Sequence, residues 1–84
     1  MKKEFSRPLV SMKGTGRNIK ALRLKKGISV KEMQDLFGFD YPQTIYNWES
    51  GKNLPSIDNL IILADFFQVP LDEIVAVSFL EDVS

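Results

Sequence analysis

Two amide side chains, Gln43 and Asn47, stand four residues apart in a segment expected to be helical. At that spacing they share one face of a helix. A Gln or Asn amide carries a donor and an acceptor side by side and can pair with the edge of an adenine, whereas Thr44 and Tyr46 offer single hydrogen bonds or apolar contact with a thymine methyl. The chemistry open to this segment is therefore base recognition by hydrogen bonding.

The groups that most enzymes need are absent or otherwise explained. The 84 residues contain no His and no Cys, which excludes a Ser-His-Asp triad, a disulfide, and a thiolate or His metal site. Gly14-Thr15-Gly16 is a lone Gly-x-Gly without nucleotide-binding context, and Asp72 and Glu73 suit the positive end of a helix dipole. We expect neither an enzyme nor a metal or other cofactor.

The net charge of zero hides a segregation along the chain. Residues 1–31 carry ten Lys/Arg against one acid, and residues 32–84 carry ten Asp/Glu against one base, Lys52. Such asymmetry indicates an electrostatic partner. The longest apolar run, residues 60–64, is far shorter than the ~20 residues that span a bilayer, and no export signal follows the basic start. We expect a cytoplasmic protein.

Capping residues and apolar spacing predict short, well-punctuated helices. Thr15, Ser29 and Tyr41 are the expected N-caps of the first three, and Ser29 with Glu32 matches a capping box. Gly27 favours a left-handed helix end. The five predicted helices lie at residues 16–26, 30–37, 42–50, 57–67 and 71–75.

The apolar residues of the predicted helices divide into a core and a second surface. In the third helix Ile45 and Trp48, three apart, are expected to face inward. The fourth helix is apolar on most sides, which is typical of deep burial or of contact with a partner. Its expected core stripe is Ile57, Leu60, Ile61, Ala64 and Phe67, and its expected dimer or partner surface is Ile62, Leu63 and Phe66.

The two ends of the chain are predicted to lie outside the helical domain. Residues 75–80 alternate with period two, as a strand does, and residues 9–12 are the simplest pairing partner. A two-stranded ribbon follows, although a continuing helix would also fit. The expected organisation is an N-terminal arm (1–15), a helix-turn-helix domain (16–75) and a C-terminal extension (76–84).

From Arg17 to Ile74 the chain resembles the lambda-repressor-like, Cro/C1-type (XRE) helix-turn-helix family. The most specific part of the match is the series Ile45-x-x-Trp48-Glu49-x-Gly51-Lys52-x-x-Pro55-Ser56. The resemblance implies an all-α, five-helix domain that binds double-stranded DNA, with the helix near 42–50 in the major groove.

The resemblance also implies roles for individual residues. Helix N-termini and the loop after the third helix are expected to meet phosphates, and Arg23 with Glu49 matches a structural ion pair of the family. The positions matching base contacts are Pro42, Gln43, Thr44, Tyr46 and Asn47. The candidate phosphate contacts are Arg17, Ser29, Lys31, Tyr41, Ser50, Lys52 and Asn53.

The chain departs from the family pattern at several positions. Val30 replaces a Gln that grips a phosphate, Gln34 replaces a small Ala, and one extra residue lies between Gly38 and Ile45. The third helix has no Lys or Arg. Because affinity depends on the number of phosphates neutralised, DNA binding by this chain is expected to be weak and to rely on hydrogen bonds.

The predicted function is that of a small bacterial transcriptional regulator, such as a repressor, acting as a homodimer on a short inverted repeat. The alternative is a protein-interaction module, such as an antitoxin or anti-repressor, that uses the apolar surface of the fourth helix. Salt-dependent, sequence-dependent binding distinguishes the first from the second. No small-molecule effector is expected within this chain.

Overall fold

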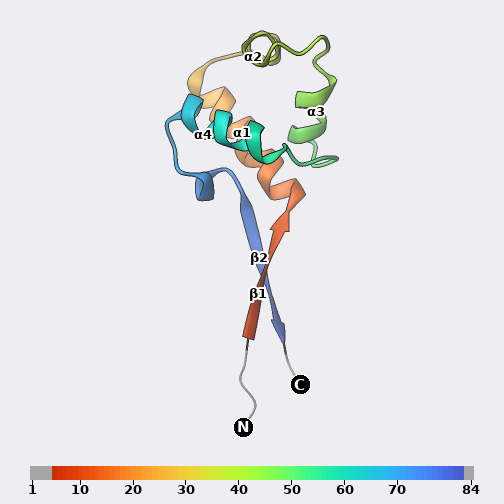
Figure 1. Ribbon diagram of the computed structural model, residues 1–84, viewed down its shortest axis with the longest axis vertical. Coiled ribbons are helices and arrows are strands. Elements are labelled where there is room, and N and C mark those ends of the chain that lie inside the picture. Colours follow the sequence, from red (N-terminus) through yellow and green to blue (C-terminus); the bar gives the residue numbers. More distant parts are fainter. Residues whose placement is uncertain (1–4, 83–84) are drawn as a thin grey trace.

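The computed structural model describes residues 5–82 and consists of a helical body with a projecting ribbon (Figure 1). Its radius of gyration, 15.1 Å, exceeds the ~12 Å expected of a compact chain of this length. The excess reflects the ribbon, because the longest dimension is 54 Å against 23 and 20 Å. The elements are β1 (Phe5–Ser11), α1 (Met12–Lys26), α2 (Val30–Phe37), α3 (Gln43–Glu49), α4 (Ile57–Phe67), a 3-10 turn (Leu71–Glu73) and β2 (Ala76–Asp82).

The predicted bounds of α2 and α4 are confirmed, and the expected capping box is present on α2. The expected N-cap of α3, Tyr41, is wrong. Pro42 takes that position with helical angles, φ −76° and ψ −7°, because the ring already holds φ near the helical value. α3 is therefore short, and it ends at Glu49, one residue before the predicted end.

Helix α1 begins four residues earlier than predicted. Its N-cap is Ser11, whose hydroxyl accepts a hydrogen bond from the Gly14 amide at 2.9 Å. Thr15, the predicted cap, lies inside the helix and is buried. Its hydroxyl instead accepts the amide of Ala76 at 3.0 Å, so Thr15 joins the first turns of α1 to the start of β2.

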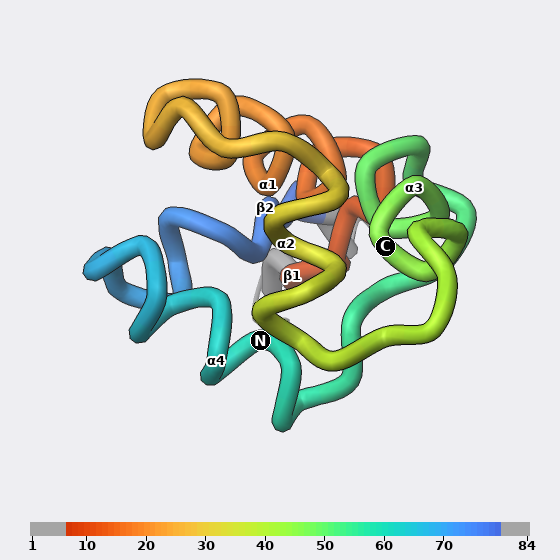
Figure 2. The backbone as a smooth tube through the Cα atoms, turned by 90° about the horizontal axis from the view of Figure 1, so that it is seen from above, coloured from red at the N-terminus to blue at the C-terminus, as the bar shows by residue number. Residues whose placement is uncertain are grey.

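The predicted ribbon is present and longer than expected. β1 and β2 pair antiparallel from Phe5↔Asp82 to Ser11↔Ala76, whereas Met12, predicted to be in the strand, begins α1. Seen from above, the strands lie beneath the helices (Figure 2). The fifth predicted helix is a 3-10 turn, because β2 begins three residues after Glu73; the described residues therefore contain four α-helices.

The core draws on every helix. Its buried apolar side chains are Ile19, Met33, Ile45, Trp48, Leu63 and Ile74. Among the helices within residues 5–82, none combines the length and apolar character needed to cross a membrane.

The orientation of α4 differs from the prediction. Leu63 is fully buried, while Ile57 is 74% and Ile61 54% exposed. The stripe that faces the core is Leu60, Leu63, Ala64 and Phe67. Two stripes of this helix were apolar at helical spacing, so its neighbours decide which one is buried. Leu63 therefore cannot belong to a partner surface.

Candidate nucleic-acid interface

The outward face of α3 consists of the residues that do not point into the core. Ile45 and Trp48 are 0% and 3% exposed and anchor the helix to the core. Consequently Gln43, Thr44 and Tyr46 are exposed, and Asn47 is half-buried. Tyr46 keeps 51% of its surface, so its ring is only partly packed.

Gln43 and Asn47 form a pair on this face. The Gln43 Nε2 donates to Asn47 Oδ1 at 2.9 Å, one helical turn away. The side-chain oxygen of Gln43 and the side-chain NH2 group of Asn47 do not take part in this bond. The pair can therefore offer one acceptor and one donor to a ligand. This combination matches the N6 donor and N7 acceptor of adenine in the major groove.

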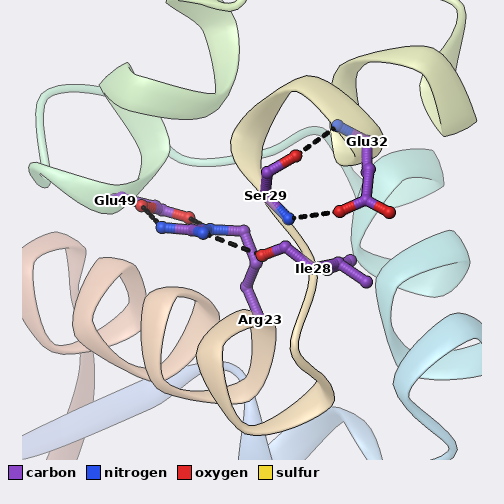
Figure 3. A network of polar contacts seen from close by, with 5 residues as sticks. All are labelled: Arg23, Ile28, Ser29, Glu32 and Glu49. Atoms are coloured by element: carbon purple, nitrogen blue, oxygen red, sulfur yellow. Dashed lines mark hydrogen bonds and ion pairs between the residues drawn. The ribbon is translucent and has the colours of Figure 1, made fainter.

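An ion pair connects the end of α3 to α1. Arg23 Nε donates to Glu49 Oε2 at 2.6 Å and Arg23 Nη2 donates to Oε1 at 3.1 Å, a two-pronged contact between side chains only 9% and 7% exposed. Figure 3 shows the guanidinium also reaching the carbonyl of Ile28. The hydrogen bond to Glu49 raises the pKa of Arg23 above its ordinary value, so the guanidinium stays charged. The structure thus brings together the two residues that the resemblance paired.

The same end of α3 lies directly against α1 at Gly16. A Cβ at Gly16 would lie 2.2 Å from the carbonyl oxygen of Trp48 and 2.7 Å from that of Glu49. Only glycine permits this close approach of two helices. Gly16 and the ion pair together fix the orientation of α3. Gly16 was expected only as the first residue of the helix at 16–26, and the Gly-x-Gly at its start was the available signal of close packing.

The lengthened turn between α2 and α3 is supported from inside. Gln34, only 7% exposed, donates from Nε2 to the carbonyl of Phe39 at 3.1 Å. The ring of Phe39 stacks on Phe37, and both meet Trp48 edge-on at 5.8 and 5.4 Å between centroids. Gln34, which stands where the family pattern has a small Ala, is therefore explained by the extra residue of the turn. The longer turn leaves the Phe39 carbonyl facing the interior, and the Gln34 side chain supplies the hydrogen bond that this carbonyl needs.

The loop after α3 is tied to Asn47. The Asn47 carbonyl accepts the amides of Lys52 at 2.9 Å and Asn53 at 3.2 Å and the hydroxyl of Ser50 at 3.3 Å. The side chains of Lys52 and Asn53 are exposed. These three candidate phosphate contacts therefore lie beside the outward face of α3.

The remaining candidate phosphate contacts are more dispersed. Ser29 uses its hydroxyl and its amide in the capping box with Glu32, and the Lys31 Nζ lies 3.2 Å from Asp35. Tyr41, 74% exposed, precedes α3. Arg17, exposed on α1, follows the glycine that touches α3.

The structure adds Lys13 to the basic residues near α3. A Cβ at Gly51 would lie 2.8 Å from the Cα of Lys13, so the first turn of α1 adjoins the loop after α3. Lys13 is exposed. Its place beside this loop was not predicted, because the first helix was expected to begin only at residue 16.

Of the predicted partner surface of α4, only Ile62 is on the outside. Phe66 is half-buried, and Lys26 Nζ lies 5.0 Å from the centre of its ring. Ile62 is exposed, whereas Leu63 is buried, and Ile57 and Ile61 are exposed although they were expected in the core. The apolar surface of α4 is therefore Ile57, Ile61 and Ile62.

Comparisons with known proteins agree on the fold. A family model described as helix-turn-helix matches residues 19–74. Two solved structures are similar, the crystal structure of the DNA-binding domain of BldD and the structure of the S. venezulae BldD DNA-binding domain. Each has a TM-score of 0.67 and 24% identity over 79% of this chain, covering 94% and 97% of its own chain respectively. No curated protein matches the sequence.

Proposed function

Because this chain belongs to the Cro/C1-type helix-turn-helix family, we propose that it binds double-stranded DNA sequence-specifically as a small transcriptional regulator. In this proposal α3 enters the major groove and α2 crosses the backbone. The observation that carries it is the exposed Gln43–Asn47 amide pair, displayed on a helix whose orientation is held by buried contacts. The two similar solved structures are described as DNA-binding domains.

Base readout on α3 is assigned to its neutral polar side chains. Gln43 and Asn47 would contact an adenine edge, while Thr44 and Tyr46 would meet a neighbouring base or thymine methyl. Pro42 would lie against the DNA at the entry to α3. Since α3 contains no Lys or Arg, recognition depends on these hydrogen bonds rather than on charge.

Phosphate contacts are assigned to residues that surround the outward face of α3. Lys52, Asn53 and Ser50 lie in the loop held by the Asn47 carbonyl, and Lys13 adjoins that loop. The N-terminus of α2 at Ser29–Lys31, Tyr41 and Arg17 would complete the set. Positive charge then surrounds the outward face of α3 and guides the approach to DNA.

We also propose that the chain acts as a homodimer on a short inverted repeat, since a two-fold protein reads a two-fold site. A second candidate function, a protein-interaction module, is favoured by the exposed Ile57, Ile61 and Ile62 of α4.

Binding to a pool of random duplexes separates the two candidates. Anisotropy titrations at about 50 and 200 mM salt should show affinity falling roughly a hundredfold if about four phosphates are contacted. Absence of binding at the lower salt would contradict the DNA proposal and favour the protein-interaction module.

A further inference from the structure

Every exposed side chain of α4 is an isoleucine or an aspartate. The exposed residues of this helix are Ile57, Asp58, Ile61, Ile62 and Asp65, and we call them the α4 face. At about 100° per residue they all lie on one side of the helix. Ile57 keeps 74% of its surface and Ile61 54%. Contiguous apolar surface rimmed by polar groups is typical of an interaction site.

The α4 face continues into an open groove at the end of the helix. The groove has a volume of about 410 Å³ and is lined by Ile61, Ala64, Asp65, Gln68, Val69 and Pro70. Gln68 ends the helix in a left-handed conformation, φ 57°, and its Nε2 donates to the carbonyl of Asp65 at 2.6 Å. Hydrogen bonds thus hold this part of the lining in place, and Asp65 is its charged member.

The end of α4 is negative and has no base to compensate it. Asp65 lies in the last turn, where the helix carbonyls already produce a negative potential, and that turn contains no basic residue. The last turn of α1, by contrast, contains Arg23, Lys25 and Lys26. Within residues 5–82, the carboxylates of Asp58 and Asp65 take part in no ion pair. A base supplied by a partner would therefore be stabilised at this end of the helix.

We propose that the α4 face and its groove bind a basic amphipathic helix of a partner protein. Such a helix lays its apolar side chains in a hydrophobic groove, and its Lys and Arg side chains would meet Asp58 and Asp65. From Ile57 to Gln68 the surface is about 16 Å long, which is about three turns of a partner helix. The proposal goes beyond DNA binding by α3 and does not rest on it.

Other occupants fit this surface less well. DNA or a negatively charged lipid surface would be repelled by the two aspartates. The α4 face of a second copy would bring the aspartates of both copies together without a base. Lys26 lies 5.0 Å from the ring centre of Phe66, a residue outside the α4 face. The charges therefore favour a basic partner.

The groove is distant from the helix that is proposed to read DNA. In both Figure 1 and Figure 2 the C-terminal end of α4 lies on one side of the helical body and α3 lies on the other. The groove is at that end of α4. A partner helix bound there would leave α3 uncovered, so the two binding events can be tested separately.

Fluorescence anisotropy with the full chain and a labelled model peptide, without DNA, tests the proposal. The probe is a Leu-Lys-Ala peptide of about 15 residues, long enough to form a helix, with its Leu residues on one side. A scrambled peptide of the same composition is the control. We expect the helical peptide to bind at micromolar concentration and the scrambled peptide to bind about tenfold more weakly, because it presents no apolar side.

Two pairs of substitutions identify the surface that binds the peptide. Asp65→Lys should weaken binding about tenfold by reversing a charge, whereas Asp40→Lys, at an exposed acid before α3, should change it less than about twofold. Lys in a last turn suits the helix dipole, so Asp65→Lys should not lower the urea midpoint. Ile61→Ser should weaken binding about tenfold, and Leu24→Ser, at a residue 59% exposed on α1, should not.

Three results would overturn the proposal: no binding of the helical peptide, equal weakening by Asp40→Lys and Asp65→Lys, or equal weakening by Leu24→Ser and Ile61→Ser. Sedimentation equilibrium tests the rival occupant. Self-association of the wild type that is lost in Ile61→Ser and kept in Leu24→Ser would assign the α4 face to a second copy and overturn the proposal. None of these results bears on DNA binding, and a chain that failed to bind DNA would leave the α4 face unaffected.

Discussion

Replacing Glu49 by Ala should destabilise the fold and weaken DNA binding together. The substitution removes both acceptors of Arg23 on α3 and leaves the guanidinium with the Ile28 carbonyl alone. Both side chains of the pair are less than a tenth exposed. Removing one partner of a buried pair costs about 3–5 kcal/mol. A domain of this length has roughly 4–13 kcal/mol of stability in total, so the loss is a large fraction.

Urea unfolding followed by tryptophan fluorescence measures this loss directly. Trp48 is the sole Trp and is 3% exposed, so its emission reports opening of the core beside the ion pair. With a slope of about 1 kcal/mol per molar urea, the midpoint should fall by about 3 M or more. DNA affinity should fall as well, because the orientation of α3 against α1 is no longer fixed.

Asp35→Ala is the matched control. It breaks the Lys31–Asp35 pair, whose side chains are 72% and 64% exposed, and exposed pairs of this spacing contribute only ~0.5 kcal/mol or less. If Glu49→Ala cost no more than Asp35→Ala, the structural role of the ion pair would be refuted. Reduced DNA affinity with an unchanged urea midpoint would instead identify Glu49 as a contact residue.

Three further substitutions test the contacts that hold α3 in place and the proposed phosphate contact at Lys52. Gly16→Ala should destabilise by about 2–3 kcal/mol, because the added methyl forces α1 away from the end of α3. Gly27→Ala has open space around it but φ 76°, and it should cost only about 1 kcal/mol from left-handed strain. Equal urea midpoints for the two variants would contradict the contact at Gly16. Gln34→Ala should cost about 1–3 kcal/mol by leaving the Phe39 carbonyl without its bond, so an unchanged midpoint would show that the bond is dispensable. Lys52→Gln should weaken binding to all duplexes alike and reduce the salt slope by about 1; a change of preferred sequence would contradict a phosphate role.

The sequence predicted the starts of helices well where a capping side chain is present. Ser29 with Glu32 located the start of α2, and Ser56 located that of α4. The start of α1 was missed because Gly14, a residue that disfavours helices, and Thr15, a good capping residue, together indicated a helix that begins at residue 16. Gly14 and Gly16 are instead positions where β2 and α3, respectively, approach α1 closely, and this packing depends on segments far away in the sequence.

The candidate site divides in the same way. The outward placement of Gln43 and Asn47 follows from the spacing of Ile45 and Trp48, so the sequence sufficed. The rotation of α4 did not follow, because this helix is apolar on two sides and tertiary contacts choose Leu63 for the core. The neighbourhood of Lys13 could not be predicted either, since it depends on how α1 packs against the loop after α3.

The most direct test of base reading by α3 is selection of duplexes from a random pool at moderate salt. The wild type should enrich a short motif with two-fold symmetry and an adenine at a fixed place in each half. Gln43→Ala and Asn47→Ala should each relax the preference at that position, by about 1–3 kcal/mol for a lost pair of contacts. Absence of any enriched motif, or the same motif from all three proteins, would contradict base reading by these two residues.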